Sequence, residues 1–287
     1  MKFRALLFAV FIVVMFAARG DARDSISEVE KAPGRLADGV QDNSFLVEEA
    51  YNQEPGMVQH TLNIVRTVSR RAGPDERALS FVFTEEWPVI TQAHQFSYTI
   101  PYTFLKTGHD SADGIEDVSL SYRFQLCTET ATRPAFAPGV SLILPTGDEE
   151  RGFGDGAVGY QTNLPVSKVV SERWTVHGNA GASYLPDVSG HDLVGYNLGA
   201  SAIFAVSSNF NLMLEAVAEW EEDIDDRGST DRNLSAVISP GFRYAFNHPN
   251  DAQTVIGLAV PIGLTSAAPD YGIFLYASFE HFFRRSK

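Results

Sequence analysis

Large apolar residues alternate with small or polar ones along most of this chain, and the pattern is clearest in the stretch 94–104, HQFSYTIPYTF. Every second residue from Phe96 to Phe104 is large and apolar, with Ser, Thr or Pro between. A period of two predicts β-strands with two different faces. The pattern recurs from Met57 onward without a helical period of useful length. It predicts about twelve strands, with approximate bounds 57–69, 77–87, 93–106, 115–127, 134–145, 156–167, 173–185, 192–206, 210–222, 232–246, 253–264 and 271–283.

The lengths and faces of these strands favour a membrane barrel. Most run past ten residues, whereas soluble strands usually have ~5–6 and a tilted transmembrane strand needs ~9–11. The face opposite the apolar one holds Gly, Ser, Thr, Asn and Gln with few charges, which suits a wet interior. Aromatic residues gather near strand ends, as two interfacial girdles would require. We therefore predict a transmembrane antiparallel up-and-down β-barrel with a hydrophilic interior; a soluble periplasmic β protein is the rival fold.

The first residues predict export. Lys2 and Arg4 precede an apolar run over 5–18, followed by small residues suited to cleavage, so we interpret 1–20 as a signal peptide. The run is shorter than the ~20 residues of a spanning helix, which argues against an uncleaved anchor. Residues 21–56 are predicted to be a flexible N-terminal segment, with 42–56 as a candidate lumen plug. Within it, Ser44–Tyr51 could form about two helical turns. The barrel then covers 57–283, and a basic tail, 284–287, ends the chain.

Charge and cysteine content exclude some classes of function. The formal charge of the whole chain is −14, and the predicted signal peptide contributes only positive charge. Phosphates would be repelled, so we expect no nucleic-acid partner. The single cysteine, Cys127, rules out an internal disulfide. We expect contact with outer-membrane lipid, lipopolysaccharide, the barrel-assembly machinery and a small-molecule solute.

Polar residues on the predicted inner face are the candidate site residues. The charged ones, Arg123, Glu215, Glu219 and Arg243, form either a structural charge network or a selectivity lining, because rings of charge determine which solutes pass. The candidates for the lumen lining are Arg123, Gln161, Asn163, His177, Asn179, Glu215, Glu219 and Arg243, and those for the plug are Phe45, Glu48, Glu49 and Tyr51.

Other motifs carry little chemistry. The glycine pattern at 154–159 is followed by a strand rather than the helix of a nucleotide site, which favours an outer loop. The acidic run 221–226 is typical of a solvated loop, or could share divalent cations with anionic lipid. The seven histidines are scattered along the sequence and none pairs at zinc spacing, so we expect no metal and no cofactor. No nucleophile elbow occurs, and we expect that the protein is not an enzyme.

Five segments, 42–60, 114–126, 138–148, 156–167 and 173–184, together resemble the phenol-degradation MetA-pathway family of outer-membrane proteins. The resemblance covers most of the predicted mature chain and keeps the order of the segments. It implies an outer-membrane β-barrel, grouped with channels for hydrophobic compounds. It supplies no catalytic residues. Ser44–Tyr51 match the family's N-terminal signature, whereas the basic residues after the last strand depart from the usual terminal Phe.

Three functions follow as hypotheses. The first is a passive channel for small hydrophobic or aromatic solutes in the outer membrane of a Gram-negative bacterium, with a lumen narrowed by 42–56. The alternative is a non-conducting structural or envelope-interaction protein of the same membrane. The third is a lipid-modifying enzyme, which would need a Ser–His or carboxylate pair opening toward the bilayer.

Overall fold

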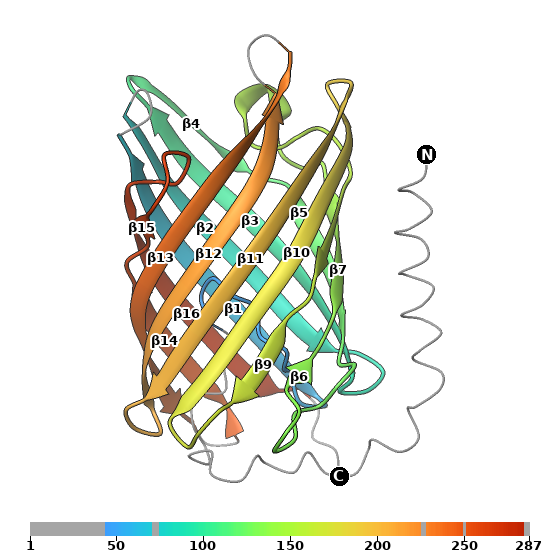
Figure 1. Ribbon diagram of the computed structural model, residues 1–287, viewed down its shortest axis with the longest axis vertical. Coiled ribbons are helices and arrows are strands. Elements are labelled where there is room, and N and C mark those ends of the chain that lie inside the picture. The colour runs from blue at the N-terminus through green and yellow to red at the C-terminus, as the bar shows by residue number, and fades with distance from the viewer. Residues whose placement is uncertain (1–43, 71–74, 225–227, 249–250, 284–287) are drawn as a thin grey trace. The chain divides into compact units, whose positions relative to one another are not determined.

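The structure, a computed structural model, describes residues 44–70, 75–224, 228–248 and 251–283. They form a closed antiparallel barrel of twelve strands, as predicted (Figure 1). The predicted signal peptide, residues 21–43 and the basic tail lie outside the described residues. In the described ranges no helix is long and apolar enough to cross a membrane.

The barrel closes because every strand pairs with a neighbour on both sides, including the first with the last. A 3-10 turn, η1, spans Glu149–Arg151. The strand segments are β1 (Met57–Ser69), β2 (Glu76–Pro88), β3 (His94–Thr107), β4 (Asp110–Ile115), β5 (Val118–Phe124), β6 (Ala135–Phe136), β7 (Gly139–Leu144), β8 (Gly159–Asn163), β9 (Val166–Val169), β10 (Trp174–Val188), β11 (His191–Ala205), β12 (Phe210–Ile224), β13 (Thr230–Asn247), β14 (Gln253–Ala259), β15 (Ile262–Gly263) and β16 (Tyr271–Phe282).

Four barrel strands are each split into two segments, namely β4/β5, β6/β7, β8/β9 and β14/β15. Three of the four breaks contain a proline: Pro138, Pro165 and Pro261. Proline has no N–H to donate to the ladder, so pairing lapses for a residue or two and then resumes. These three interruptions are therefore caused by local sequence, and they leave the barrel closed.

The predicted alternation of faces is present on the strands. On β12, Leu212 and Leu214 are exposed on the outside, whereas Met213 and Glu215 are buried inside. A side chain that is exposed on an outer-membrane barrel faces hydrocarbon, where apolar surface is favoured. The oily outer face that the sequence predicts is thus confirmed.

The expectation of a uniformly hydrophilic interior is wrong for one half of the barrel. There, inward side chains from β11 to β14 and from β16 form an apolar cluster around Phe45. β16 explains the error, because its sequence is aromatic on both faces: Tyr271 and Ile273 point outward, while Phe274 and Tyr276 point inward and are buried. A period-two pattern distinguishes faces only where their chemistry differs.

Residues 44–56, which we call the lumen segment, run through the interior without regular secondary structure. The helical turns predicted for Ser44–Tyr51 are therefore absent. A helix would require backbone N–H groups to bond to carbonyls within the segment. Here those of Phe45, Leu46 and Val47 bond instead to the Glu215 carboxylate on the barrel wall.

Candidate functional site

The apolar end of the lumen segment is Phe45, whose ring lies against two inward aromatic rings of β16. The centroids of the Phe45 and Phe274 rings are 5.4 Å apart, and the two ring planes are nearly parallel, with an interplanar angle of 18°. The centroids of the Phe45 and Tyr276 rings are 5.0 Å apart, with an interplanar angle of 32°. Gly257 on β14 also faces this ring, and a Cβ placed on Gly257 would lie 2.3 Å from Cζ of Phe45. Only glycine at this position leaves room for the ring.

Glu215 holds the same end of the segment through the backbone. Its carboxylate accepts N–H groups from Phe45 at 3.3 Å, Leu46 at 3.0 Å and Val47 at 3.2 Å. The side chain is 1% exposed, and the positive charge of Arg243 on β13 acts on it. A buried carboxylate persists when donors and a countercharge surround it. Glu215 is therefore the anchor of this part of the lumen segment.

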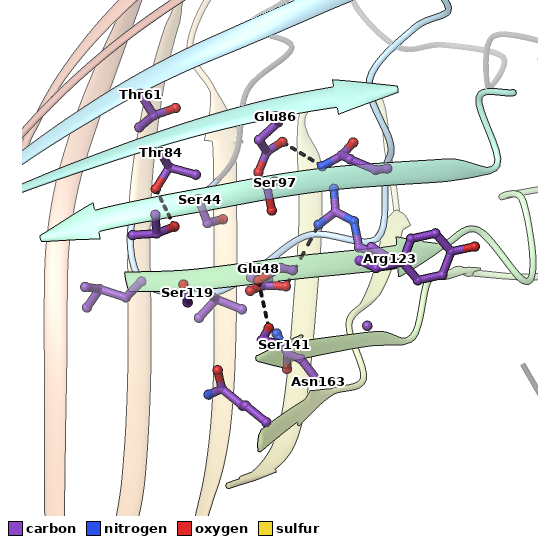
Figure 2. A pocket seen from close by; sticks show the side chains of 18 of the residues that line it. Ser44, Glu48, Thr61, Thr84, Glu86, Ser97, Ser119, Arg123, Ser141 and Asn163 are labelled. Atoms are coloured by element: carbon purple, nitrogen blue, oxygen red, sulfur yellow. Dashed lines mark hydrogen bonds and ion pairs between the residues drawn. The ribbon is translucent and has the colours of Figure 1, made fainter. Parts of the chain in front are cut away.

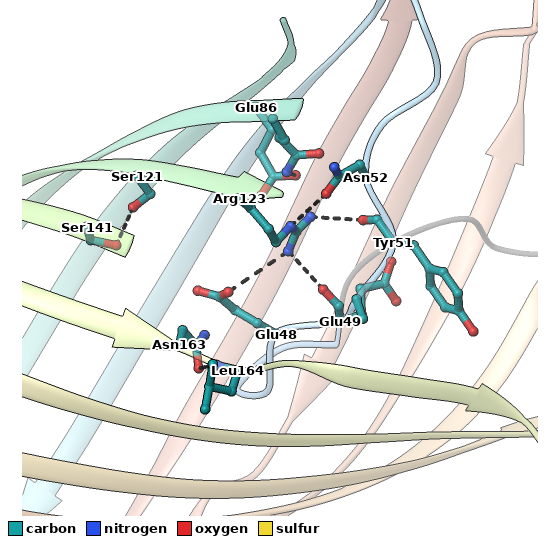
Figure 3. Close-up of polar contacts among 12 residues, drawn as sticks. Glu48, Glu49, Tyr51, Asn52, Glu86, Ser121, Arg123, Ser141, Asn163 and Leu164 are labelled. Carbon is teal, nitrogen blue, oxygen red and sulfur yellow. Dashed lines mark hydrogen bonds and ion pairs between the residues drawn. The ribbon is translucent and has the colours of Figure 1, made fainter. Parts of the chain in front are cut away.

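Arg123 on β5 holds the other end of the segment by its carbonyls (Figure 3). Nη1 donates to the carbonyl of Glu49 at 2.8 Å, Nη2 to that of Tyr51 at 2.9 Å, and Nε to Oδ1 of Asn52 at 3.0 Å. The Glu48 carboxylate lies 3.9 Å from Nη1. The planar guanidinium presents its donors in a fixed fork, which matches several acceptors at once.

A serine and a histidine meet beneath the middle of the segment. Ser167 Oγ lies 2.7 Å from Nδ1 of His177 and accepts the N–H of Ala50 at 2.8 Å. The Glu49 carboxylate is 3.8 Å from Nε2 of His177. Ser167 is fully buried and faces the interior, so this pair does not open toward the bilayer as the lipid-enzyme hypothesis requires. Its hydroxyl is already engaged in holding the segment.

A cavity of about 230 Å³ lies beside the lumen segment. The barrel wall that lines it is formed by β1, β2, β3, β5, β7 and β8 (Figure 2). Its wall is dominated by hydroxyl groups. Thr84 Oγ1 is 2.9 Å from Thr99 Oγ1, and Ser121 Oγ is 2.8 Å from Ser141 Oγ. Strand register creates two rows of lining side chains that run across neighbouring strands: Thr61, Thr84, Thr99 and Ser119 in one, and Glu86, Ser97, Ser121, Ser141 and Gln161 in the other.

The predicted lining residues are divided between these regions. Gln161, Asn163 and Arg123 line the cavity, whereas His177, Glu215 and Arg243 are buried beside the lumen segment or beneath it. Asn179 and Glu219 are half-buried on β10 and β12. Whether a solute touches any of them stays a prediction.

The four plug candidates all lie in the lumen segment and differ in their contacts. The ring of Phe45 packs in the apolar half. The carboxylate of Glu48 reaches the cavity beside Asn163 (Figure 2). Glu49 faces His177, and the hydroxyl of Tyr51 donates to Glu129.

Several contact residues could not be chosen from the sequence. Phe274 and Tyr276 belong to a strand that is aromatic on both faces, so the sequence does not single them out, and the alternation along β16 places them on its inner face. Ser167, Gln95 and Glu86 resemble many other polar strand residues. Their roles depend on which groups of the lumen segment lie opposite them. Gln95, for example, accepts the backbone N–H of Gln53 at 2.8 Å.

Histidines that are scattered in sequence also meet on the outer face. His60 Nε2 lies 3.4 Å from Nε2 of His281, and His60 Nδ1 lies 2.6 Å from the Glu85 carboxylate. The strands β16, β1 and β2 bring them together near the ends where the chain enters and leaves the barrel. Across the described ranges, no three His, Cys, Asp or Glu side chains are arranged to hold a metal ion.

Closure, an apolar outer face and a partly polar interior define an outer-membrane β-barrel. The profile of the family described as "Putative MetA-pathway of phenol degradation" matches residues 61–279, and the chain belongs to this family. No curated protein matches the sequence.

Two solved structures show the same kind of fold. The COG4313 outer membrane channel from Pseudomonas putida F1 matches with a TM-score of 0.64 and 15% identity, covering 82% of this chain and 98% of that one. The transport unit of the autotransporter AIDA-I from Escherichia coli matches with a TM-score of 0.50 and 10% identity, covering 84% and 95%. At these identities the likeness concerns the fold alone.

Proposed function

We propose that this barrel is a passive outer-membrane channel for small hydrophobic or aromatic solutes, and that the lumen segment is its constriction. The observation that carries the proposal is the position of the segment. It crosses the interior, fills the apolar half with Phe45 and leaves a cavity along the hydroxyl-lined wall. A twelve-stranded barrel is wider than the eight-stranded barrels whose side chains alone fill the interior.

The lining supports solutes that are uncharged and combine a ring or other apolar part with a polar group. One side of the cavity is formed by Phe45 and Tyr276, and the other by serine and threonine hydroxyls. The overall negative charge of the chain disfavours anions. The family description, which refers to phenol degradation, is consistent with a ring-bearing solute.

A removable crosslink tests whether the segment limits passage. The hydroxyls of Ser44 and Ser201 lie 2.9 Å apart, so these side chains point toward each other, as the two cysteines of a disulfide must. We expect Ser44→Cys with Ser201→Cys, in a Cys127→Ser background, to form a disulfide that fixes the segment. In planar bilayers the oxidised protein should conduct less than the same protein after reduction. The Cys127→Ser protein and each single-cysteine variant, treated identically, are the controls.

Deletion of 44–54 provides the complementary measurement, and it should raise conductance above that of the intact chain. Equal conductance of the intact, locked and deleted proteins would contradict the constriction. If none of the three conducts, the channel is refuted in favour of the non-conducting envelope protein.

A further inference from the structure

The apolar half of the lumen contains a seat for one six-membered ring. We call it the ring socket, and its walls are Met213, Val255, Gly257, Phe274 and Tyr276. The side chains of Met213, Val255, Phe274 and Tyr276 are buried, and glycine at 257 opens the space that the ring tip of Phe45 fills. Two of the walls are themselves aromatic and lie at stacking distance from the occupant. The socket is therefore shaped for a flat aromatic group.

The present occupant is held in a way that allows it to leave. The lumen segment forms no strand pairing with the barrel among the described residues. Besides the packing of its apolar side chains, its attachment near Phe45 comprises the three N–H bonds to Glu215 and the contact between the hydroxyls of Ser44 and Ser201. Departure of the segment would break no ladder hydrogen bond, so the barrel would stay closed.

We propose that Phe45 is an exchangeable internal ligand and that the ring socket binds the aromatic ring of a solute in its place. The inference deepens the proposed channel function, on which it rests, by assigning the solute a binding station. The solute class is a single uncharged aromatic ring that carries an O–H or N–H donor.

The donor is required by Glu215. When the segment leaves, the carboxylate loses three N–H donors at the rim of an apolar site, and only the attraction of Arg243 remains among the interactions described above. A buried acceptor without donors is unfavourable. A ring that brings its own donor restores one of those bonds, a bare ring restores none, and a carboxylated ring adds repulsion between like charges.

The test uses the full-length barrel in detergent and fluorinated rings observed by ¹⁹F NMR. Phe45→Ala vacates the socket, as large-to-small changes in an apolar site create room for small aromatic molecules. We expect this variant to bind 4-fluorophenol at least about tenfold more tightly than the wild type does. In the wild type, where a solute ring must displace the lumen segment and its three N–H donors, 4-fluorophenol should bind more tightly than fluorobenzene or 4-fluorobenzoate.

The matched control is Phe45→Ala combined with Gly257→Ala, because the new methyl would lie where the ring tip was. The double variant should lose the added binding, whereas the partitioning of 4-fluorophenol into the detergent should be the same for both proteins. Heat-modifiable gel migration checks that each variant is folded. Equal binding of 4-fluorophenol by all three proteins would overturn the socket, and equal affinity of the wild type for fluorobenzene and 4-fluorophenol would overturn the role of Glu215.

A second measurement needs no variant. Saturating 4-fluorophenol should raise hydrogen exchange at the amides of Phe45, Leu46 and Val47 in the wild type, since exchange of the occupant exposes them. Unchanged exchange would contradict the proposal. Conductance separates the two hypotheses: ring binding without conductance refutes the channel and leaves the socket, whereas conductance without ring binding refutes the socket alone.

Discussion

The two halves of the lumen hold the same segment by opposite chemistry. In the apolar half, a buried carboxylate on β12 collects backbone N–H groups and an aromatic seat receives Phe45. In the hydroxyl-lined half, a guanidinium on β5 collects backbone carbonyls and leaves a cavity beside them. An irregular segment in the interior has no ladder to satisfy its backbone polar groups. The charged anchor on one side, Glu215, accepts hydrogen bonds. The anchor on the other side, Arg123, donates them, and Gln95 accepts the N–H of Gln53 beside it.

This contrast separates anchoring from lining. Glu215 and Arg123 are inward charges that could be interpreted as a selectivity ring. Each of them, however, forms hydrogen bonds with the lumen segment. The hydroxyls of the cavity wall bond mainly to one another, as Ser121 and Ser141 do. Solutes would therefore meet hydroxyl groups along most of the wall, with the carboxylates of Glu48 and Glu86 and the guanidinium of Arg123 also lining the cavity.

The largest effect is expected from Glu215→Ala, which leaves three backbone N–H groups without their acceptor. At about 1 kcal/mol or more for each lost bond, the docked state should weaken by about 3 kcal/mol. Hydrogen exchange at Phe45, Leu46 and Val47 should then accelerate about a hundredfold. Glu219→Ala, on the same face of β12, is the matched control and should change these amides far less. Unaltered exchange in Glu215→Ala would show that Phe45 packing alone holds this half.

Arg123→Ala should have a smaller effect, confined to the other end of the segment. The lost bonds come from a charged donor, and water from the cavity can replace some of them, so we expect about 2 kcal/mol. The amides of Asn52 and Gln53 should exchange about thirtyfold faster, with those of Phe45 to Val47 little affected. Arg66→Ala, an exposed arginine on the outside of β1, is the control. Equal acceleration at both ends would mean that the segment leaves as one unit.

The smallest effect is expected from Ser121→Ala combined with Ser141→Ala in the cavity wall. Removing both partners of a hydrogen bond leaves no unsatisfied group, and the cost should stay below about 1 kcal/mol. Thermal unfolding in detergent, followed by gel migration, should shift little, and exchange of the lumen segment should not change. The single variant Ser121→Ala, which leaves the Ser141 hydroxyl without this partner, is the comparison and should cost at least as much stability. A larger loss in the double variant would indicate that the wall hydroxyls hold the segment.

The sequence by itself determined the strands, their approximate bounds and the outer face, because alternation with a period of two is a local property of each strand. Pro138, Pro165 and Pro261 likewise fix the interruptions locally. The family resemblance added an N-terminal signature around Ser44–Tyr51 without its structure. These features required no knowledge of which strands would lie opposite one another.

Only the tertiary structure decided what the interior does. Glu215 and Phe45 are 170 residues apart in sequence, and no local pattern could pair them. Nor could a pattern show that the lumen segment gives up helical hydrogen bonds for bonds to the wall, since that choice depends on the partners that closure brings into reach. The inward aromatic face of β16 became a ring seat for the same reason: the barrel placed it against a glycine and a segment from the other end of the chain.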